Sequence, residues 1–334
     1  MKKKSLIALT LGVSLLFTAC SSTSSTVKED KNKAEATSSK SYPASVTNFN
    51  FDKTENKITF NKKPERVIST NQTTTELLLH FGLEDQLVGT AYMDNPILDN
   101  LKEKHDKIPV LSDKYPTKEM VIEKNPDLII GWKSAFSDKV LGGVNTWNEK
   151  DVNTFIQRNS GIAEKATVEN VYKDIEDIGT IFDIKDKTDA YIADMKKNIE
   201  GIENSIKDVK SKLKVLVIEG SKDNKYTSYG SNTLVSDMVE KAGGKNVVEK
   251  GGTMGPENIV ELNPDVIVLI HFEAQVKDNK EKDALLNNPA LQSVQAIKDK
   301  KILYTPLAET YGGSVRTATG IENLAKGLYP DLVK

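Results

Sequence analysis

Arginine is scarce in this chain, and two of its three occurrences stand where binding chemistry is expected. Only Arg66, Arg158 and Arg316 occur, whereas lysine supplies the rest of the 46 basic side chains. A guanidinium makes planar, bidentate hydrogen bonds that an ammonium cannot, so these positions indicate a need for that geometry. Arg158 follows an expected strand and Arg316 begins an expected helix. Both suit an anionic ligand group or, alternatively, a structural ion pair, whereas Arg66 precedes the first strand and is predicted to be structural.

Aromatic and polar side chains gather in the loops that are expected to follow strands. In open parallel sheets, ligands bind beyond the carboxyl ends of the strands, and pockets often form between lobes. Beside Arg158 and Arg316, the predicted ligand-binding residues are therefore Asn71, Gln72, Tyr92, Tyr115, Trp132, Lys133, Tyr229, His271 and Tyr311. Trp132 could equally cap a core, and a buried structural histidine is the alternative for His271.

Composition excludes several function classes. Three scattered histidines do not supply the histidine and carboxylate cluster that a free zinc or manganese ion would need. A single cysteine excludes a disulfide framework, and a net charge of −2 with mixed signs gives no footprint for nucleic acid. The sequence has no Gly-x-Ser-x-Gly elbow and no phosphate loop, so an enzyme is the weaker alternative to a binding protein, and a structural or adhesive protein is weaker still.

Strands and helices must position these residues. Residues 47–60 alternate as a hairpin does, and residues 165–210 are wholly helical between two stretches in which apolar runs alternate with helices. Strands separated by helices predict parallel sheets that are covered on both faces. We therefore predict an α/β fold with two Rossmann-like lobes, residues 46–185 and 211–334, whose central parallel sheets are joined by a single long α-helix at 186–210.

The first residues are typical of an export signal. Lysines 2–4 precede the apolar run "SLIALTLGVSLLFTA", which is too short to be a spanning helix, and the run ends at Cys20. The sequence "LFTAC" resembles a bacterial lipoprotein signal, so residues 1–19 are predicted to be removed and Cys20 to be lipidated, for example by palmitate. An ordinary secretory signal with a chance cysteine is the alternative. The polar residues 20–45 are predicted to be a flexible tether.

One short unit occurs twice. "KEMVIEKNPDLII" at residues 118–130 and "PENIVELNPDVIV" at 256–268 share two glutamates, Asn-Pro-Asp and apolar positions. In each copy proline ends a helix and an Asp-led strand follows. Glu119 and Glu257 thus stand in the first turns of equivalent helices. Complementation of the helix dipole, worth ~0.3–1 kcal/mol, is one explanation.

Several motifs, taken together in order, resemble the class III substrate-binding proteins of ABC importers. They are the lipoprotein-like signal, the polar tether, "PERVIST" with "TTTELLLHFGLEDQLVG", the two Asn-Pro-Asp units, the long middle helix, and the terminal "GSVR" with "LAKGLYP". The resemblance implies a monomer on the extracytoplasmic face of the cell membrane, without enzymatic activity or cofactor. It also implies that Glu119 and Glu257 dock onto arginines of two permease subunits, which work with a cytoplasmic ATPase. The Lys- and Asn-rich composition suggests a Gram-positive cell.

The same resemblance bounds the transported ligand. A ferric siderophore is the leading expectation, held through Arg158, Lys133 and Arg316 with tyrosine and tryptophan around it, while the chelator itself holds the iron. Haem is the second possibility, with axial candidates at Tyr92, Tyr115, His271 and Tyr311. Cobalamin is the third. A single stiff helix between the lobes predicts that closure on the ligand moves them by only a few ångströms.

Overall fold

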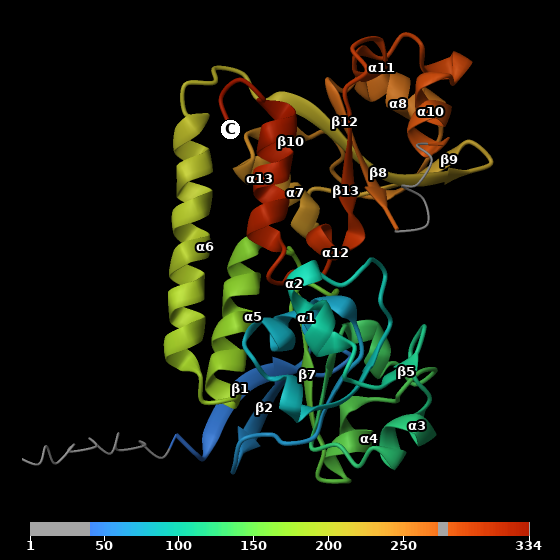
Figure 1. Ribbon diagram of the computed structural model, residues 1–334. Helices are drawn as coiled ribbons and strands as arrows, with labels where there is room; N and C mark the ends of the chain where they lie inside the picture. Colours follow the sequence, from blue (N-terminus) through green and yellow to red (C-terminus); the bar gives the residue numbers. More distant parts are fainter. Residues whose placement is uncertain (1–40, 273–279, 334) are drawn as a thin grey trace, which may run out of the picture. The chain divides into compact units, whose positions relative to one another are not determined.

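The computed structural model describes residues 41–272 and 280–333 (Figure 1). The predicted signal peptide, Cys20 and most of the tether lie in residues 1–40, outside the described residues. Within the described residues, no helix combines the length and the apolar character needed to cross a bilayer.

The chain begins with the predicted hairpin. β1 (Ala44–Phe49) and β2 (Glu55–Phe60) pair antiparallel. The Asn48 side chain is fully buried and exchanges two hydrogen bonds with the backbone of Ile156, at 2.7 and 3.1 Å. The hairpin is therefore fastened to the sheet that follows it.

The first lobe is built on a five-stranded parallel sheet with the order β5-β4-β3-β6-β7. Its strands are β3 (Val67–Ser69), β4 (Leu87–Ala91), β5 (Val110–Ser112), β6 (Leu128–Gly131) and β7 (Asn153–Ile156). Its helices are α1 (Gln72–His80), α2 (Asp99–His105), α3 (Lys118–Glu123) and α4 (Val144–Asn148). The chain builds outward from β3 to one side and then from β6 to the other, which is the Rossmann-like order, so the topological switch point lies between β3 and β6.

The second lobe is built on a six-stranded sheet. β8 (Leu213–Lys222) lies between β12 (Val266–His271) on one side and β9 (Lys225–Ser228) and β10 (Gly244–Asn246) on the other, with β13 (Ile302–Pro306) and β11 (Gly252–Met254) at the edges. Strands β8, β10, β12 and β13 are parallel, as predicted, but β9 runs antiparallel to β8, and β11 in turn runs antiparallel to β9. The reversal occurs at Asp223 and Asn224, which both have positive φ, as a tight hairpin turn requires.

Helices cover the second sheet. They are α7 (Leu234–Lys241), α8 (Pro256–Leu262), α10 (Lys280–Leu286), α11 (Gln295–Lys298), α12 (Leu307–Thr310) and α13 (Thr317–Leu328).

Two helices connect the lobes. α5 (Val168–Ile181) and α6 (Lys185–Ser205) pack against each other, and α6 also packs on α13 (Figure 1). Met195, Ile199 and Ile202 recur on one face of α6 and are buried. The helix ends at Ser205, five residues earlier than predicted. One continuous core runs through α5 and α6 and includes apolar side chains of both sheets.

A glycine pair brings the lobes into close contact. Gly312 and Gly313 both have positive φ. A Cβ atom on Gly312 would lie 2.6 Å from Trp132 Nε1, and one on Gly313 would lie 2.3 Å from a methyl carbon of Val171. No other residue type fits this approach without displacing the first lobe from the α12–α13 connection.

Candidate functional site

Four aromatic side chains meet at the carboxyl ends of the strands. Tyr92, Tyr115 and Trp132 follow β4, β5 and β6, and Tyr311 follows α12 in the second lobe. The ring centroids of Tyr92 and Tyr115 are 4.7 Å apart, those of Tyr92 and Trp132 are 6.2 Å apart, and those of Trp132 and Tyr311 are 4.7 Å apart. We call these four residues the aromatic cluster. It lies beside the switch point of the first sheet, where open α/β sheets bind ligands.

Trp132 is the member of the aromatic cluster that hydrogen bonds hold most firmly in place. It is only 7% exposed. Its backbone N–H donates to Asn71 Oδ1 at 2.9 Å, and its indole N–H lies 2.9 Å from Thr73 Oγ1 and 3.1 Å from Gln157 Oε1. Gln157 in turn donates to the Gly313 carbonyl at 2.8 Å. The indole is thus tied to both lobes, and only a small part of its ring is accessible.

Asn71 and Gln72 have internal partners. Besides Trp132, Asn71 contacts the Tyr115 hydroxyl at 3.4 Å. Gln72 is buried, accepts from the backbone N–H groups of Asp94 and Asn95, and donates to the Pro96 carbonyl. Gln72 therefore supports the loop that carries Tyr92, whereas Asn71 supports Trp132 and Tyr115.

Tyr92 itself has a backbone conformation that is uncommon for its residue type. Its φ is +58°, in the left-handed region, and such conformations concentrate at functional sites. The Lys114 ammonium lies 4.5 Å from the centre of the Tyr92 ring. Lys133, by contrast, lies 3.9 Å from the centre of the Phe51 ring in the β1–β2 turn. Lys114, which is exposed, is thus the lysine that accompanies the aromatic cluster.

Arg316 bridges the two lobes through Glu76. Its guanidinium donates in a bidentate manner to the fully buried Glu76 carboxylate, with Nε 2.6 Å from Oε2, and it also donates to the Pro96 carbonyl at 2.6 Å. The charge of Arg316 is therefore balanced within the protein. The structure favours the structural ion pair that the sequence left open.

The Arg158 side chain also forms ion pairs within the protein. Its guanidinium lies 2.6 Å from the Asp174 carboxylate and 2.8 Å from that of Asp177, both on α5. Although burial opposes it, the two carboxylates raise the pKa of Arg158. This geometry supports the interpretation of Arg158 as part of a structural ion pair. Arg66 also makes structural contacts, because it donates to the carbonyls of Asn125 and Lys124.

The second lobe contributes Tyr229 and His271 near the same edge. The Tyr229 hydroxyl donates to Glu219 at 3.1 Å, and burial, followed by the charge of Glu219, raises the pKa of Tyr229. The His271 ring packs edge-on against Tyr304, with centroids 5.5 Å apart, and burial lowers the pKa of His271. Its Nδ1 lies 3.4 Å from the Phe272 carbonyl oxygen. These contacts match the structural alternative for the histidine.

Two carboxylates were missed at the sequence level. Asp94 follows Tyr92 in the loop after β4, and burial raises the pKa of Asp94 to about 6, with Lys114 opposing and Glu219 adding. Glu219 interrupts the otherwise apolar strand run "VLVIEG". A charge inside a buried strand is a signal that could have identified it. Among the described residues, no group of three or more His, Cys, Asp or Glu side chains is arranged to hold a metal ion.

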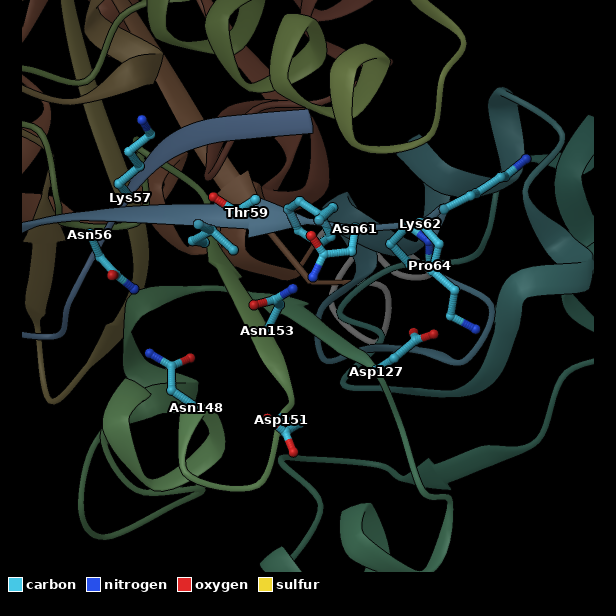
Figure 2. Close-up of a pocket in the computed structure, with 13 residues that line it drawn as sticks. Asn56, Lys57, Thr59, Asn61, Lys62, Pro64, Asp127, Asn148, Asp151 and Asn153 are labelled. Carbon is cyan, nitrogen blue, oxygen red and sulfur yellow. The ribbon is translucent and has the colours of Figure 1, made fainter. Parts of the chain in front are cut away.

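A polar hollow of about 380 Å³ lies elsewhere (Figure 2). Asp127 and Asn153 stand there at the amino ends of β6 and β7, and β2 forms its rim. The hollow thus lies at the amino ends of the strands, whereas the aromatic cluster lies at their carboxyl ends. None of the predicted ligand-binding residues lines this hollow.

Glu119 and Glu257 are both exposed, in the first turns of α3 and α8. Hydrogen bonds from the Glu119 backbone N–H and from the Thr117 hydroxyl hold the pKa of the Glu119 carboxyl below its usual range.

Trp147 is 1% exposed and donates to the Leu141 carbonyl at 3.0 Å, which makes it part of the core rather than of the site.

The Glu76–Arg316 pair gives a direct test of how the lobes are joined. Arg316→Ala leaves a buried carboxylate without its counter-charge, and we expect a loss of about 3–5 kcal/mol in the free energy of unfolding. The double variant Glu76→Leu/Arg316→Met should lose much less. Urea titration followed by circular dichroism measures both. The control is Lys326→Ala, which removes the partly exposed Lys326–Glu322 pair of α13 and should cost less than about 1 kcal/mol. Equal losses in the single and double variants would contradict this account.

Asp94 makes stability depend on pH. Its folded pKa of about 6 lies above the usual 3.8, so its contribution to stability is full below about pH 4 and is lost as the pH rises through about 6. Asp94→Asn should therefore stabilise the protein at pH 7.5 by about 1 kcal/mol, after an allowance for solvent screening. The gain should vanish at pH 4. Thermal unfolding at both pH values measures it, with the exposed Asp113→Asn as control, and a pH-independent gain would contradict the assignment.

Comparison with known proteins shows which family the chain resembles. The sequence model of the periplasmic binding protein family matches residues 67–308. The chain is 26% identical to YvrC of Bacillus subtilis, an uncharacterized ABC transporter substrate-binding lipoprotein, over 85% of this chain and 86% of that one. It is 25% identical to the petrobactin-binding protein YclQ of the same organism, over 96% of each chain.

Among solved structures, a periplasmic binding protein from Veillonella parvula superposes with a TM-score of 0.78 at 26% identity, covering 86% of this chain and 98% of that one. The predicted α/β fold is thereby confirmed, as is the prediction of a binding protein rather than an enzyme. The match over most of the folded part shows that the chain belongs to the periplasmic binding protein family.

Proposed function

We propose that this chain is the substrate-binding lipoprotein of an ABC importer and that it captures a ferric siderophore for delivery to a membrane permease. The aromatic cluster is the observation that carries the proposal. It gathers four rings from both lobes at the switch point, and Lys114 lies over one of them. Aromatic faces with an adjacent cation suit an anionic organic chelate, whereas a bare metal ion would need a set of ligating side chains.

The relatives support this proposal. One of them is named for petrobactin binding and another for an ABC transporter lipoprotein. On this basis we place the chain on the extracytoplasmic face of the membrane, anchored through a lipid at Cys20, with the permease and its ATPase as partners. Since Arg158 and Arg316 are engaged in internal ion pairs, Lys114 is the cation that we assign to the chelate.

Tryptophan fluorescence tests the ligand class. The chain has two tryptophans, of which Trp132 belongs to the aromatic cluster and Trp147 to the core. The soluble protein starting near Ser21 should show saturable quenching by one chelate from a panel of ferric hydroxamates, catecholates and citrate, because the ligand would lie against Trp132. Trp132→Phe should abolish the response, and Trp147→Phe should retain it.

Haem and cobalamin belong in the same panel. A haem complex would show a Soret band, and a ferric siderophore complex a broad visible charge-transfer band. If only haem or cobalamin gives saturable quenching, that compound and not a ferric siderophore is the ligand. The absence of any response, checked by calorimetry, would contradict the proposed function.

The docking proposal has its own test. Glu119→Ala and Glu257→Ala should leave chelate affinity unchanged but reduce uptake about tenfold, because each removes one charged contact with the permease. Cellular uptake of the radiolabelled iron chelate measures the effect. Glu123→Ala and Glu261→Ala are matched controls, since both carboxylates are exposed and stand one turn later in the same helices. Loss of chelate affinity in solution would contradict a docking role.

A further inference from the structure

The two repeated units are fastened to their sheets by the same contacts. The Asp127 N–H donates to the Arg66 carbonyl at 2.9 Å, and its carboxylate accepts from the Arg66 N–H at 3.0 Å. In the second unit, Asp265 makes the same two contacts with Lys214, both at 2.8 Å. Each aspartate thus pairs with a residue at the start of the central strand of its lobe, because Arg66 directly precedes β3 and Lys214 is the second residue of β8.

The ends of the two helices are also held alike. Asn125 and Asn263 have φ values of 45° and 40°, which turns the chain in the left-handed region before each proline. Arg66 Nε donates to the Asn125 carbonyl at 2.8 Å, and Lys214 Nζ donates to the Leu262 carbonyl at 3.1 Å. A cation at the carbonyl end of a helix is favourable. α3 and α8 are therefore presented by equivalent, well-anchored supports.

Each of these helices shows an apolar side chain on its outer face. Val121 and Ile259 point inward and are fully buried. The next residue along each chain, Ile122 or Val260, is 51% or 38% exposed. The large hydrophobic side chains that are exposed in the described part of the chain are Phe51, Val110, Met120, Ile122, Val260 and Leu332. Half of this set falls on two helices of six and seven residues, so the exposure is concentrated there.

The exposed apolar residues stand beside the glutamates. Glu119 and Ile122 are three positions apart, as are Glu257 and Val260, and residues at this spacing are neighbours on a helix surface. The same pair of a carboxylate and a branched aliphatic side chain therefore occurs once on each lobe. We call each pair a Glu–aliphatic pair. Two copies of one pattern fit a partner that offers two similar surfaces.

We propose that Ile122 and Val260 are the apolar centres of the two surfaces that bind the permease. This inference rests on the proposed function and adds to it the chemistry of the partner: each permease subunit would present an apolar depression next to the cation that receives the glutamate. The glutamates would steer and orient the association, while apolar contacts at the centre of an interface exclude water and add affinity of their own.

The two surfaces are not identical. Met120, two residues before Ile122 on α3, is 36% exposed, whereas its counterpart Asn258 accepts a hydrogen bond from the Gly255 N–H at 3.0 Å. The helix α3 therefore exposes more apolar side chain than α8, and Ile122 itself is more exposed than Val260. Substitution of Ile122 should weaken binding more than substitution of Val260.

Ile122→Ser, Val260→Ser and the double variant test the proposal. Because both side chains are exposed, the thermal unfolding midpoint and the chelate affinity should remain unchanged. The protein concentration that gives half-maximal chelate-dependent uptake into spheroplasts lacking the chromosomal copy should rise about tenfold for Ile122→Ser, less for Val260→Ser and more than tenfold for the double variant. Ile122→Val and Val260→Ile should behave like the wild type. Leu332→Ser, which removes an exposed apolar side chain outside the two units, is the matched control.

Salt separates the apolar contact from the ion pairs. The effect of Glu119→Ala should shrink as ionic strength rises, while that of Ile122→Ser should persist, because screening acts only on charges. Wild-type uptake with full activity of the double serine variant would overturn this inference and leave the proposed function intact. If wild-type protein neither binds nor delivers a chelate, the proposed function itself fails. A wild-type dimer that the double variant dissociates would show that a second copy, not a permease, occupies these surfaces.

Discussion

The buried ion pair between Glu76 and Arg316 is the contact on which the arrangement of the candidate site depends. It joins α1 of the first lobe to the start of α13 in the second, across 240 residues of sequence. A carboxylate that is fully removed from water is tolerated only with a matching partner, so the pair fixes how the two elements face each other. Arg316 also holds the Pro96 carbonyl, and Gln72 holds the backbone just before it. Through these contacts the loop that carries Tyr92 and Asp94 is set by the same ion pair that joins the lobes.

Much of the fold could be predicted because it follows from local patterns. Apolar runs that alternate with helices predicted the parallel strands, and the wholly helical stretch 165–210 predicted α5 and α6. The antiparallel β9 could not be found in this way, because a two-residue turn at Asp223 and Asn224 is a weak signal and the strand that follows it has only four residues. The position of the candidate site was predictable for the same reason that the strands were, since loops at the carboxyl ends of parallel strands gather at one edge.

The roles of individual polar side chains were less predictable. Rarity drew attention to Arg158 and Arg316, but their partners lie on α5 and α1, and a single sequence does not reveal which acid a distant base will meet. The repeated unit was easier to interpret, because its two copies carry the same residues. Its structural equivalence extends to Arg66 and Lys214, which lie outside the repeated letters and serve one purpose with different cations. Burial of Asp94 is likewise a property of the folded loop, and nothing in the local sequence predicts it.

The anchoring of α3 and α8 has a mechanical consequence. Each helix is fixed to a different sheet, while contacts between the lobes include the packed glycines at residues 312 and 313, α6 and the buried Glu76–Arg316 ion pair. The separation of the two exposed glutamates is therefore a readout of the angle between the lobes. A small rotation of one lobe relative to the other would displace Glu119 and Glu257 by more than it displaces the residues near the rotation axis. A rigid surface that touches both glutamates would sense occupancy of the centre without contacting whatever is held there.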